Sequence, residues 1–217
     1  MAVKFTGTGV ATVINTDCDP DPRNVHSWLP LIGDPPGSGA LRILYGVLRP
    51  EYRHVANRAV DFGRAKLQPV PPPPDAPEAV TAARAEVLLP DEADDRFACP
   101  NVFLSAHDAE RPAEKAVLLT YVTITYSTSR LHIQFETVRE IMLGIVRAHG
   151  AAMLLVQHAP NRAGSANLPH VHALIGRRIT SLGLSTFVPA FCGDKGRDVI
   201  VNAFAPLRDR LASNQQH

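Results

Sequence analysis

The sequence predicts an α+β fold, in which an antiparallel sheet carries a helix on one face. Residues 116–127 alternate along the chain and are rich in β-branched and aromatic side chains, which is typical of a strand. Residues 151–158 and 168–175 are two further apolar runs of strand length. A helical pattern lies between the first two strands. The order strand, helix, strand, loop, strand predicts one sheet with the helix packed against it.

The helix is predicted from the spacing of its apolar residues. These recur every three or four positions, as on one face of an amphipathic helix, and Gly150 is a suitable residue to end it. The last two strands are joined only by the polar segment PNRAGSAN, so we expect them to be adjacent and antiparallel. The apolar positions are Leu131, Phe135, Val138, Met142 and Ile145.

Composition limits the classes of protein. With 217 residues, 45% of them hydrophobic, the chain can form one large domain or a compact domain with an appendage. The 22 basic and 21 acidic residues give a net charge of +1, so a phosphate-binding patch would have to be local. Three scattered cysteines do not indicate a disulfide framework. Because neither a signal peptide nor an 18-residue apolar run is visible, we expect a cytoplasmic protein without a membrane partner.

Proline marks the clearest break in the chain. The segment QPVPPPPDAPE, residues 68–78, lacks several backbone donors and favours a stiff extended linker. Before it, residues 40–60 have a helical composition; after it, residues 79–90 are rich in alanine and predict a short helix, and a short strand is expected at 198–204. The predicted parts are an irregular and helical N-terminal region (1–67), a proline-rich linker with a short helix (68–99) and the α+β domain (100–210).

Three histidines are the strongest functional signal. His170 and His172 lie two apart on a strand, so their side chains share one face. His158 ends the preceding strand, and a hairpin would bring it close to the other two. Three neutral imidazoles suit Zn²⁺, Mn²⁺ or a similar ion. The alternative is that the histidines are structural, since a His-x-His pair alone is often satisfied by ordinary protein partners.

The segment HAPNRAGSANLPHVHALIGRR, residues 158–178, resembles the metal motif of HUH endonucleases, and specifically of MobA/MobL-type plasmid relaxases. That motif has a histidine at a strand end, a polar loop, then Asn-Pro-His-x-His, apolar residues and an arginine. Leu168 is inserted here between the asparagine and the proline. The resemblance extends over roughly residues 116–180. The matching residues are His158, Asn167, Pro169, His170, His172 and Arg178.

The resemblance implies a function in plasmid mobilisation. It implies that His158, His170 and His172 hold a divalent ion (Mg²⁺, Mn²⁺ or Zn²⁺) that polarises a phosphate of single-stranded DNA. A tyrosine would attack that phosphate and form a 5′-phosphotyrosyl link. Arg178 would contact the substrate. The implied partners are single-stranded DNA and the accessory proteins of a relaxosome.

The nucleophile is less clear than the metal site. All four tyrosines precede the histidines, which is the order found in relaxases. Tyr52 is the first candidate because Glu51-Tyr52-Arg53 resembles an Ala-Tyr-Arg segment of that family, and Tyr45 is the second. Tyr121 and Tyr126 point to opposite faces of one strand, so at most one of them faces the metal. Full relaxases commonly carry a helicase or a long helical tail, which this sequence lacks, so we expect a minimal relaxase, a degenerate one or a metal-binding relic.

Two alternatives stay open. The same stretch resembles the histidine triad nucleotide hydrolases, in which His172 would attack a nucleotide phosphate. That motif requires a third histidine where this chain has Leu174, and it leaves His158 unexplained. The other alternative is a non-enzymatic accessory protein of a plasmid or phage, with structural histidines.

Overall fold

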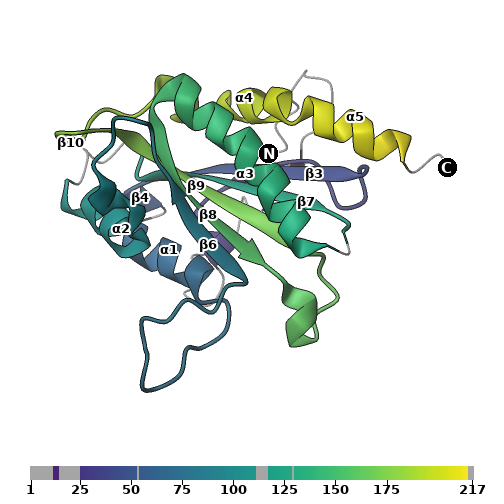
Figure 1. Ribbon diagram of the computed structural model, residues 1–217, viewed down its shortest axis with the longest axis horizontal. Coiled ribbons are helices and arrows are strands. Elements are labelled where there is room, and N and C mark those ends of the chain that lie inside the picture. The colour runs from purple at the N-terminus through teal and green to yellow at the C-terminus, as the bar shows by residue number, and fades with distance from the viewer. Residues whose placement is uncertain (1–11, 15–24, 53, 111–116, 129, 215–217) are drawn as a thin grey trace.

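The computed structural model describes residues 12–14, 25–52, 54–110, 117–128 and 130–214. Their largest element is an eight-stranded antiparallel sheet in the order β1-β2-β3-β7-β9-β8-β6, with β10 paired to β9 (Figure 1). The strands are β1 (Thr12–Ile14), β2 (Leu31–Gly33), β3 (Leu41–Leu48), β6 (Arg84–Leu88), β7 (Leu119–Tyr126), β8 (Ala151–His158), β9 (His170–Thr180) and β10 (Gly183–Leu184). A separate pair consists of β4 (Glu51–Tyr52) and β5 (Val55–Ala56).

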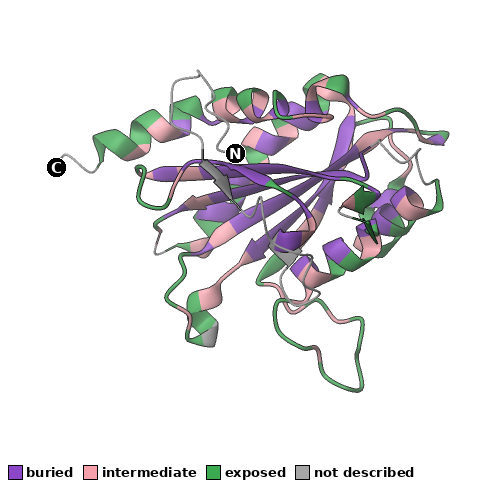
Figure 2. Ribbon diagram, turned by 180° about the vertical axis from the view of Figure 1, so that it is seen from behind, coloured by how far each residue is buried: buried purple, intermediate pink, exposed green. Residues whose placement is uncertain are grey.

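Helices cover both faces of the sheet, so its strands are buried along most of their length (Figure 2). The helices α3, α4 and α5 pack on one face, and α1 and α2 pack on the other. Within the described residues, no helix is both long and apolar enough to cross a bilayer. The helices are α1 (Ala59–Leu67), α2 (Pro100–Ala109), α3 (Leu131–His149), α4 (Gly196–Ala203) and α5 (Ala205–Ser213), with 3-10 turns at Val25–Trp28, Asp95–Ala98, Pro160–Ala163 and Pro189–Phe191.

The α+β class is confirmed, and the predicted segment β7-α3-β8-β9 forms in the predicted order. Helix α3 buries Phe135, Val138 and Met142 against the sheet, because their spacing places them on one face. Gly150 ends the helix with a φ of 68°, a left-handed conformation that glycine adopts without strain. Strands β8 and β9 are adjacent and antiparallel.

The helix predicted within residues 40–60 is wrong. This stretch contains the strands β3, β4 and β5; β3 pairs with β7 over its full length, and α1 begins only at Ala59. The reason is burial on both faces: Ile43 and Tyr45 pack in the core under α3, whereas Leu44 and Leu48 pack in the core under α1. A strand covered on both sides is apolar throughout and lacks the alternation that identifies strands.

The short helix predicted at 79–90 is also wrong, because this stretch contains the edge strand β6, paired with β8. Two charged residues of β6 form ion pairs with α3: Arg84 with Glu136, and Glu86 with Arg139, the latter at 2.7 Å. Strands of all three predicted parts of the chain therefore join in one sheet.

The strand predicted at 198–204 is a helix instead. Val199 to Val201 have strand propensity, but Ile200, Phe204 and Leu207 recur at spacings of four and three. All three are buried against the sheet face that carries α3. The helical period of the buried residues thus outweighs the local preference of the valines.

Helix α2 contributes a buried histidine that links it to β9. The Nδ1–H group of His107 donates to the Phe103 carbonyl at 2.7 Å, and its Nε2 accepts from the backbone N–H of Arg177 at 3.0 Å. Gly176 makes this contact possible, because a Cβ there would lie 2.4 Å from Nε2. His107 is therefore neutral in the fold, and burial lowers its pKa to about 4.

This histidine makes stability depend on pH. The unfolded chain takes up a proton near the ordinary pKa of about 6.5, whereas the folded chain resists protonation down to about 4. Stability from His107 is therefore present above pH 6.5 and lost as the pH falls from there toward 4, by about 3 kcal/mol in total. Urea titrations at pH 7 and pH 4.5 should show a smaller pH effect for His107→Gln than for wild type. Equal pH effects in both proteins would contradict a neutral His107.

Candidate metal centre

The β8–β9 hairpin brings the three predicted histidines together. His158 pairs directly with His170, and Val156 pairs with His172, so the three imidazoles share the sheet face that carries α1. One nitrogen from each ring lies within 4.8 Å of the other two. The rings of His158 and His172 are closest, with centroids 4.4 Å apart.

In two of the three histidines, a hydrogen bond determines which ring nitrogen is free to bind an ion. Nε2–H of His158 donates to the backbone carbonyl of Lys66 at 2.6 Å, which leaves the Nδ1 lone pair facing the cluster. Nδ1–H of His170 donates to the Leu168 carbonyl at 2.8 Å, which leaves Nε2. Such outer hydrogen bonds are the usual means of orienting histidine ligands.

His172, the third residue of β9, supplies the third imidazole. Its Nε2 lies 3.2 Å from His158 Nδ1, and its Nδ1 lies near two hydroxyls of β7. Ligand nitrogens about 2.1 Å from a tetrahedral ion would be roughly 3.4 Å apart. The three histidines could therefore close on one ion with small movements of the rings.

The environment favours neutral imidazoles, the form that binds metal. Burial is the main cause that lowers the pKa of His158 to about 4; its hydrogen bond to the Lys66 carbonyl opposes this shift, and the charges of His170 and Lys66 add to it. Burial also lowers the pKa of His170. Among the described residues no carboxylate joins the cluster. Of the three ions expected, an all-nitrogen set suits Zn²⁺ best, because Mg²⁺ and Mn²⁺ favour oxygen ligands.

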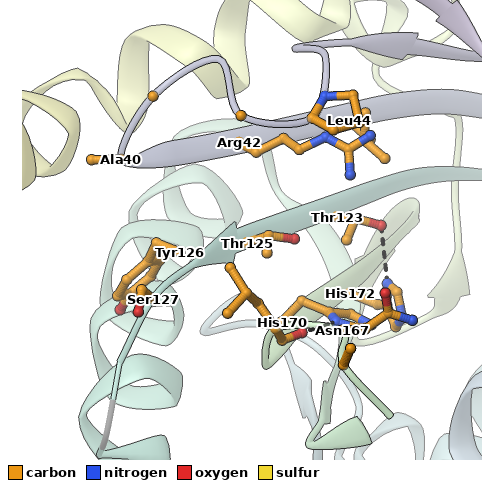
Figure 3. A pocket seen from close by; sticks show the side chains of 15 residues that line it. Ala40, Arg42, Leu44, Thr123, Thr125, Tyr126, Ser127, Asn167, His170 and His172 are labelled. Carbon is orange, nitrogen blue, oxygen red and sulfur yellow. Dashed lines mark hydrogen bonds between the residues drawn. The ribbon is translucent and has the colours of Figure 1, made fainter. Parts of the chain in front are cut away.

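The cluster opens into a polar groove of about 570 Å³ (Figure 3). The groove crosses β3, β7 and β9: His170 and His172 lie on one side, Thr123 and Thr125 in the middle, and Arg42 on the far side. Asn167, from the loop before β9, also lines it. Hydroxyl, amide and guanidinium groups are the donors that proteins use against phosphate.

A second cavity, of about 430 Å³, lies on the other side of His158. Its walls come from the start of the proline-rich segment and from the turn after β8, including Val70, Pro160 and Arg162. The histidine cluster therefore borders open space toward β3 and toward β6.

Tyr45, one of the two tyrosines expected to act as nucleophile, faces away from the histidines. Tyr45 is fully buried on the opposite face of the sheet, where its hydroxyl donates to the carbonyls of Phe191 and Gly193 at 3.0 Å. Burial raises the pKa of this hydroxyl above its usual value. It therefore cannot reach a phosphate held by the histidines, because the sheet lies between them.

The structure does not bring Tyr52 to the cluster either. Tyr52 is in β4, beyond the end of β3 that pairs with Leu119. The histidines lie toward the other end of β3, since His170 and His172 neighbour Thr125 and Thr123 of β7. Lys66, whose carbonyl contacts His158, lies near the end of helix α1, and most of that helix separates it in sequence from Tyr52.

Arg178 is likewise remote from the histidines. It lies six residues after His172 on the same strand, about 20 Å away at the rise of an extended chain. Its Nε donates to the His149 carbonyl at the end of α3, at 2.9 Å. Its observed role is to hold α3 against β9, and the predicted contact with a substrate phosphate at the histidines is not supported.

Two residues of the site were not predicted. The Tyr121 hydroxyl lies 2.8 Å from His172 Nδ1, a contact that follows from the pairing of β7 with β9. Lys66 is buried with its amine 4.8 Å from the centre of the Tyr121 ring, and burial lowers its pKa to about 7. Side chains alternate along β7, so the face on which Tyr121 lies can be inferred once β9 is known to be its neighbour. No sequence signal singles out Lys66.

Comparisons with known proteins give little further information. No family model matches the chain, and no curated protein matches it. A solved structure described as the molecular basis of vancomycin resistance transfer in Staphylococcus aureus aligns with 63% of this chain and 75% of its own, with 17% identity and a TM-score of 0.49.

Proposed function

We propose that the protein cleaves phosphodiester bonds of single-stranded DNA at a divalent metal ion held by His158, His170 and His172. The observation that carries the proposal is the convergence of three imidazoles at the edge of an open polar groove. When bound, the ion would act as a Lewis acid on a phosphate oxygen. The resemblance of residues 158–178 to the HUH motif supports DNA as the substrate.

The shape and polar groups of the groove suit an extended, phosphate-bearing ligand. Its polar groups come from separate strands and a loop, so they form a track across the sheet and not a closed pocket. Arg42 is the cation on the side opposite the histidines, and its Nε already donates to the Asp34 carbonyl at 2.9 Å, which fixes its orientation. A single strand can lie along such a track with phosphates facing the polar groups.

We further propose that water is the nucleophile. The hydroxyl of Tyr45 lies on the wrong face, that of Tyr121 is committed to His172, and that of Tyr126 donates to the Gln134 carbonyl at 3.4 Å. In hydrolysis the water oxygen bonds to phosphorus, the bond from phosphorus to the leaving sugar oxygen breaks, and that oxygen takes up a proton. The product is then a phosphate monoester and a free hydroxyl, without a protein adduct.

The test uses a randomised single-stranded library, because the preferred site is not known. Full-length protein with Mn²⁺ or Zn²⁺ should release ends that sequencing maps to a preferred site, and EDTA should stop the reaction. Duplex DNA of the same composition should be cut far more slowly. Denaturing gels should show no protein–DNA adduct, and Tyr52→Phe should cleave like wild type.

Two outcomes would contradict this proposal. Metal-loaded protein that cuts no member of the library would exclude the nuclease function. A covalent adduct that disappears in Tyr52→Phe would keep the nuclease but replace water by that tyrosine. The variant His132→Ala is the matched control, because His132 is an exposed histidine outside the cluster and should behave as wild type.

A further inference from the structure

We propose that Tyr121 and Thr123 are positioning residues of the metal centre, whose hydroxyl oxygens accept a hydrogen bond from the Nδ1–H group of His172 and so present its Nε2 lone pair to the ion. This inference rests on the proposed metal-binding role of the three histidines. It gives Tyr121 a role in orienting a ligand and not in attacking a phosphate.

The geometry places both hydroxyls on one ring nitrogen. The Tyr121 hydroxyl lies 2.8 Å and the Thr123 hydroxyl 3.0 Å from His172 Nδ1. His172 is 2%, Thr123 6% and Tyr121 0% exposed, so both contacts are largely shielded from bulk water. The Thr123 side chain also hydrogen bonds to Tyr121, which gives the two hydroxyls a way to redistribute their protons.

His172 differs from the other two ligands in how its tautomer is set. Backbone carbonyls can only accept, so they fix the protons of His158 and His170. Hydroxyls can donate or accept, so His172 can carry its proton on either nitrogen. Without an ion, its Nε2–H can donate to the His158 Nδ1 lone pair 3.2 Å away. Binding an ion requires the other tautomer, with the proton on Nδ1 facing the two hydroxyls.

Packing keeps Tyr121 in this position. Its ring meets the edge of Phe62 at a centroid distance of 5.3 Å and an interplanar angle of 88°, and the Lys66 amine lies 4.8 Å from its centre. Phe62 and Lys66 both belong to α1, the helix whose end contacts His158. One helix therefore supports two of the three imidazoles, one through a carbonyl and one through the Tyr121 ring.

The experiment measures affinity for Zn²⁺ by competition with a chelator, without DNA. Removing the outer hydrogen-bond partner of a histidine ligand typically weakens metal binding by about 10- to 100-fold. We expect that loss for the double variant Tyr121→Phe/Thr123→Val and a smaller loss for each single variant, because one hydroxyl remains. Thr123→Ser, which keeps the hydroxyl, should bind like wild type. Tyr126→Phe on the opposite face of the same strand is the matched control.

Ring-nitrogen NMR provides the second readout, which a purely structural role would not change. In wild type, adding Zn²⁺ should move the His172 proton to Nδ1; in the double variant this tautomer should be less populated at equal metal. Thermal unfolding shows whether each variant is folded. A folded double variant that binds Zn²⁺ as tightly as wild type overturns this inference alone. Wild type that binds no Zn²⁺ or Mn²⁺ overturns the proposed metal-dependent function as well.

Discussion

Replacing His158 with alanine is expected to abolish both metal binding and DNA cleavage. The variant loses one of three nitrogen ligands, and the remaining pair on β9 cannot enclose an ion. We expect affinity for Zn²⁺ to fall by more than about 100-fold, since loss of a mere outer partner of a ligand costs 10- to 100-fold. Cleavage at a fixed, low metal concentration should fall by at least the same factor. Chelator competition and the library assay measure the two effects on the same preparations.

The same variant separates the metal centre from the histidine-triad alternative. In a histidine-triad hydrolase, His172 would act on a nucleotide without metal, and His158 would be dispensable. Here His172 is buried with its Nδ1 at two hydroxyls, and its Nε2 faces His158. Metal-independent hydrolysis of nucleotides that survives His158→Ala but not His172→Ala would therefore contradict the metal site. His132→Ala controls for loss of an imidazole elsewhere on the surface.

The hairpin that carries the histidines could be predicted because all its determinants are local. Eleven residues separate the facing ends of β8 and β9, and side-chain parity alone puts His170 and His172 on one face. Helix α3 could be predicted equally well, since apolar residues recur every three or four positions in this 19-residue helix. Local patterns thus gave the central part of the sheet and the metal ligands.

The rest of the site depends on which strands are neighbours, and a single sequence does not encode that visibly. Tyr121 reaches His172 because β7 lies next to β9, 49 residues apart at the Thr123–His172 pair. Tyr45 fails as a candidate because β3 also joins this sheet, with that side chain on the far face. Arg178 is close to the histidines in the motif but far from them in space, because a strand advances about 3.3 Å per residue and Arg178 lies six residues after His172.

Asp34 links the sheet to the C-terminal helices through a largely buried carboxylate, so its loss should clearly reduce stability. It follows β2, and its carboxylate is 10% exposed. It accepts from Arg197 of α4 at 2.6 Å, from Arg208 of α5 at 3.1 Å and from the backbone N–H of Ile43 in β3 at 3.0 Å. One carboxylate therefore ties the edge of the sheet to both C-terminal helices, beside the turn that forms a wall of the groove.

Asp34→Ala is expected to lower the free energy of unfolding by about 3 kcal/mol, because it leaves the buried Arg197 guanidinium without its anion. For a chain of this size that corresponds to a fall in Tm of roughly 6–12 °C. The matched control is Glu78→Ala, which removes an exposed ion pair with Arg64 and should cost no more than about 1 kcal/mol. Urea and thermal unfolding of the three proteins measure the difference.

Since Arg208 is one-third exposed, water can solvate it in the variant, so the cost belongs mainly to Arg197. If Asp34→Ala and Glu78→Ala lower stability equally, the carboxylate does not hold α4 and α5 to the sheet.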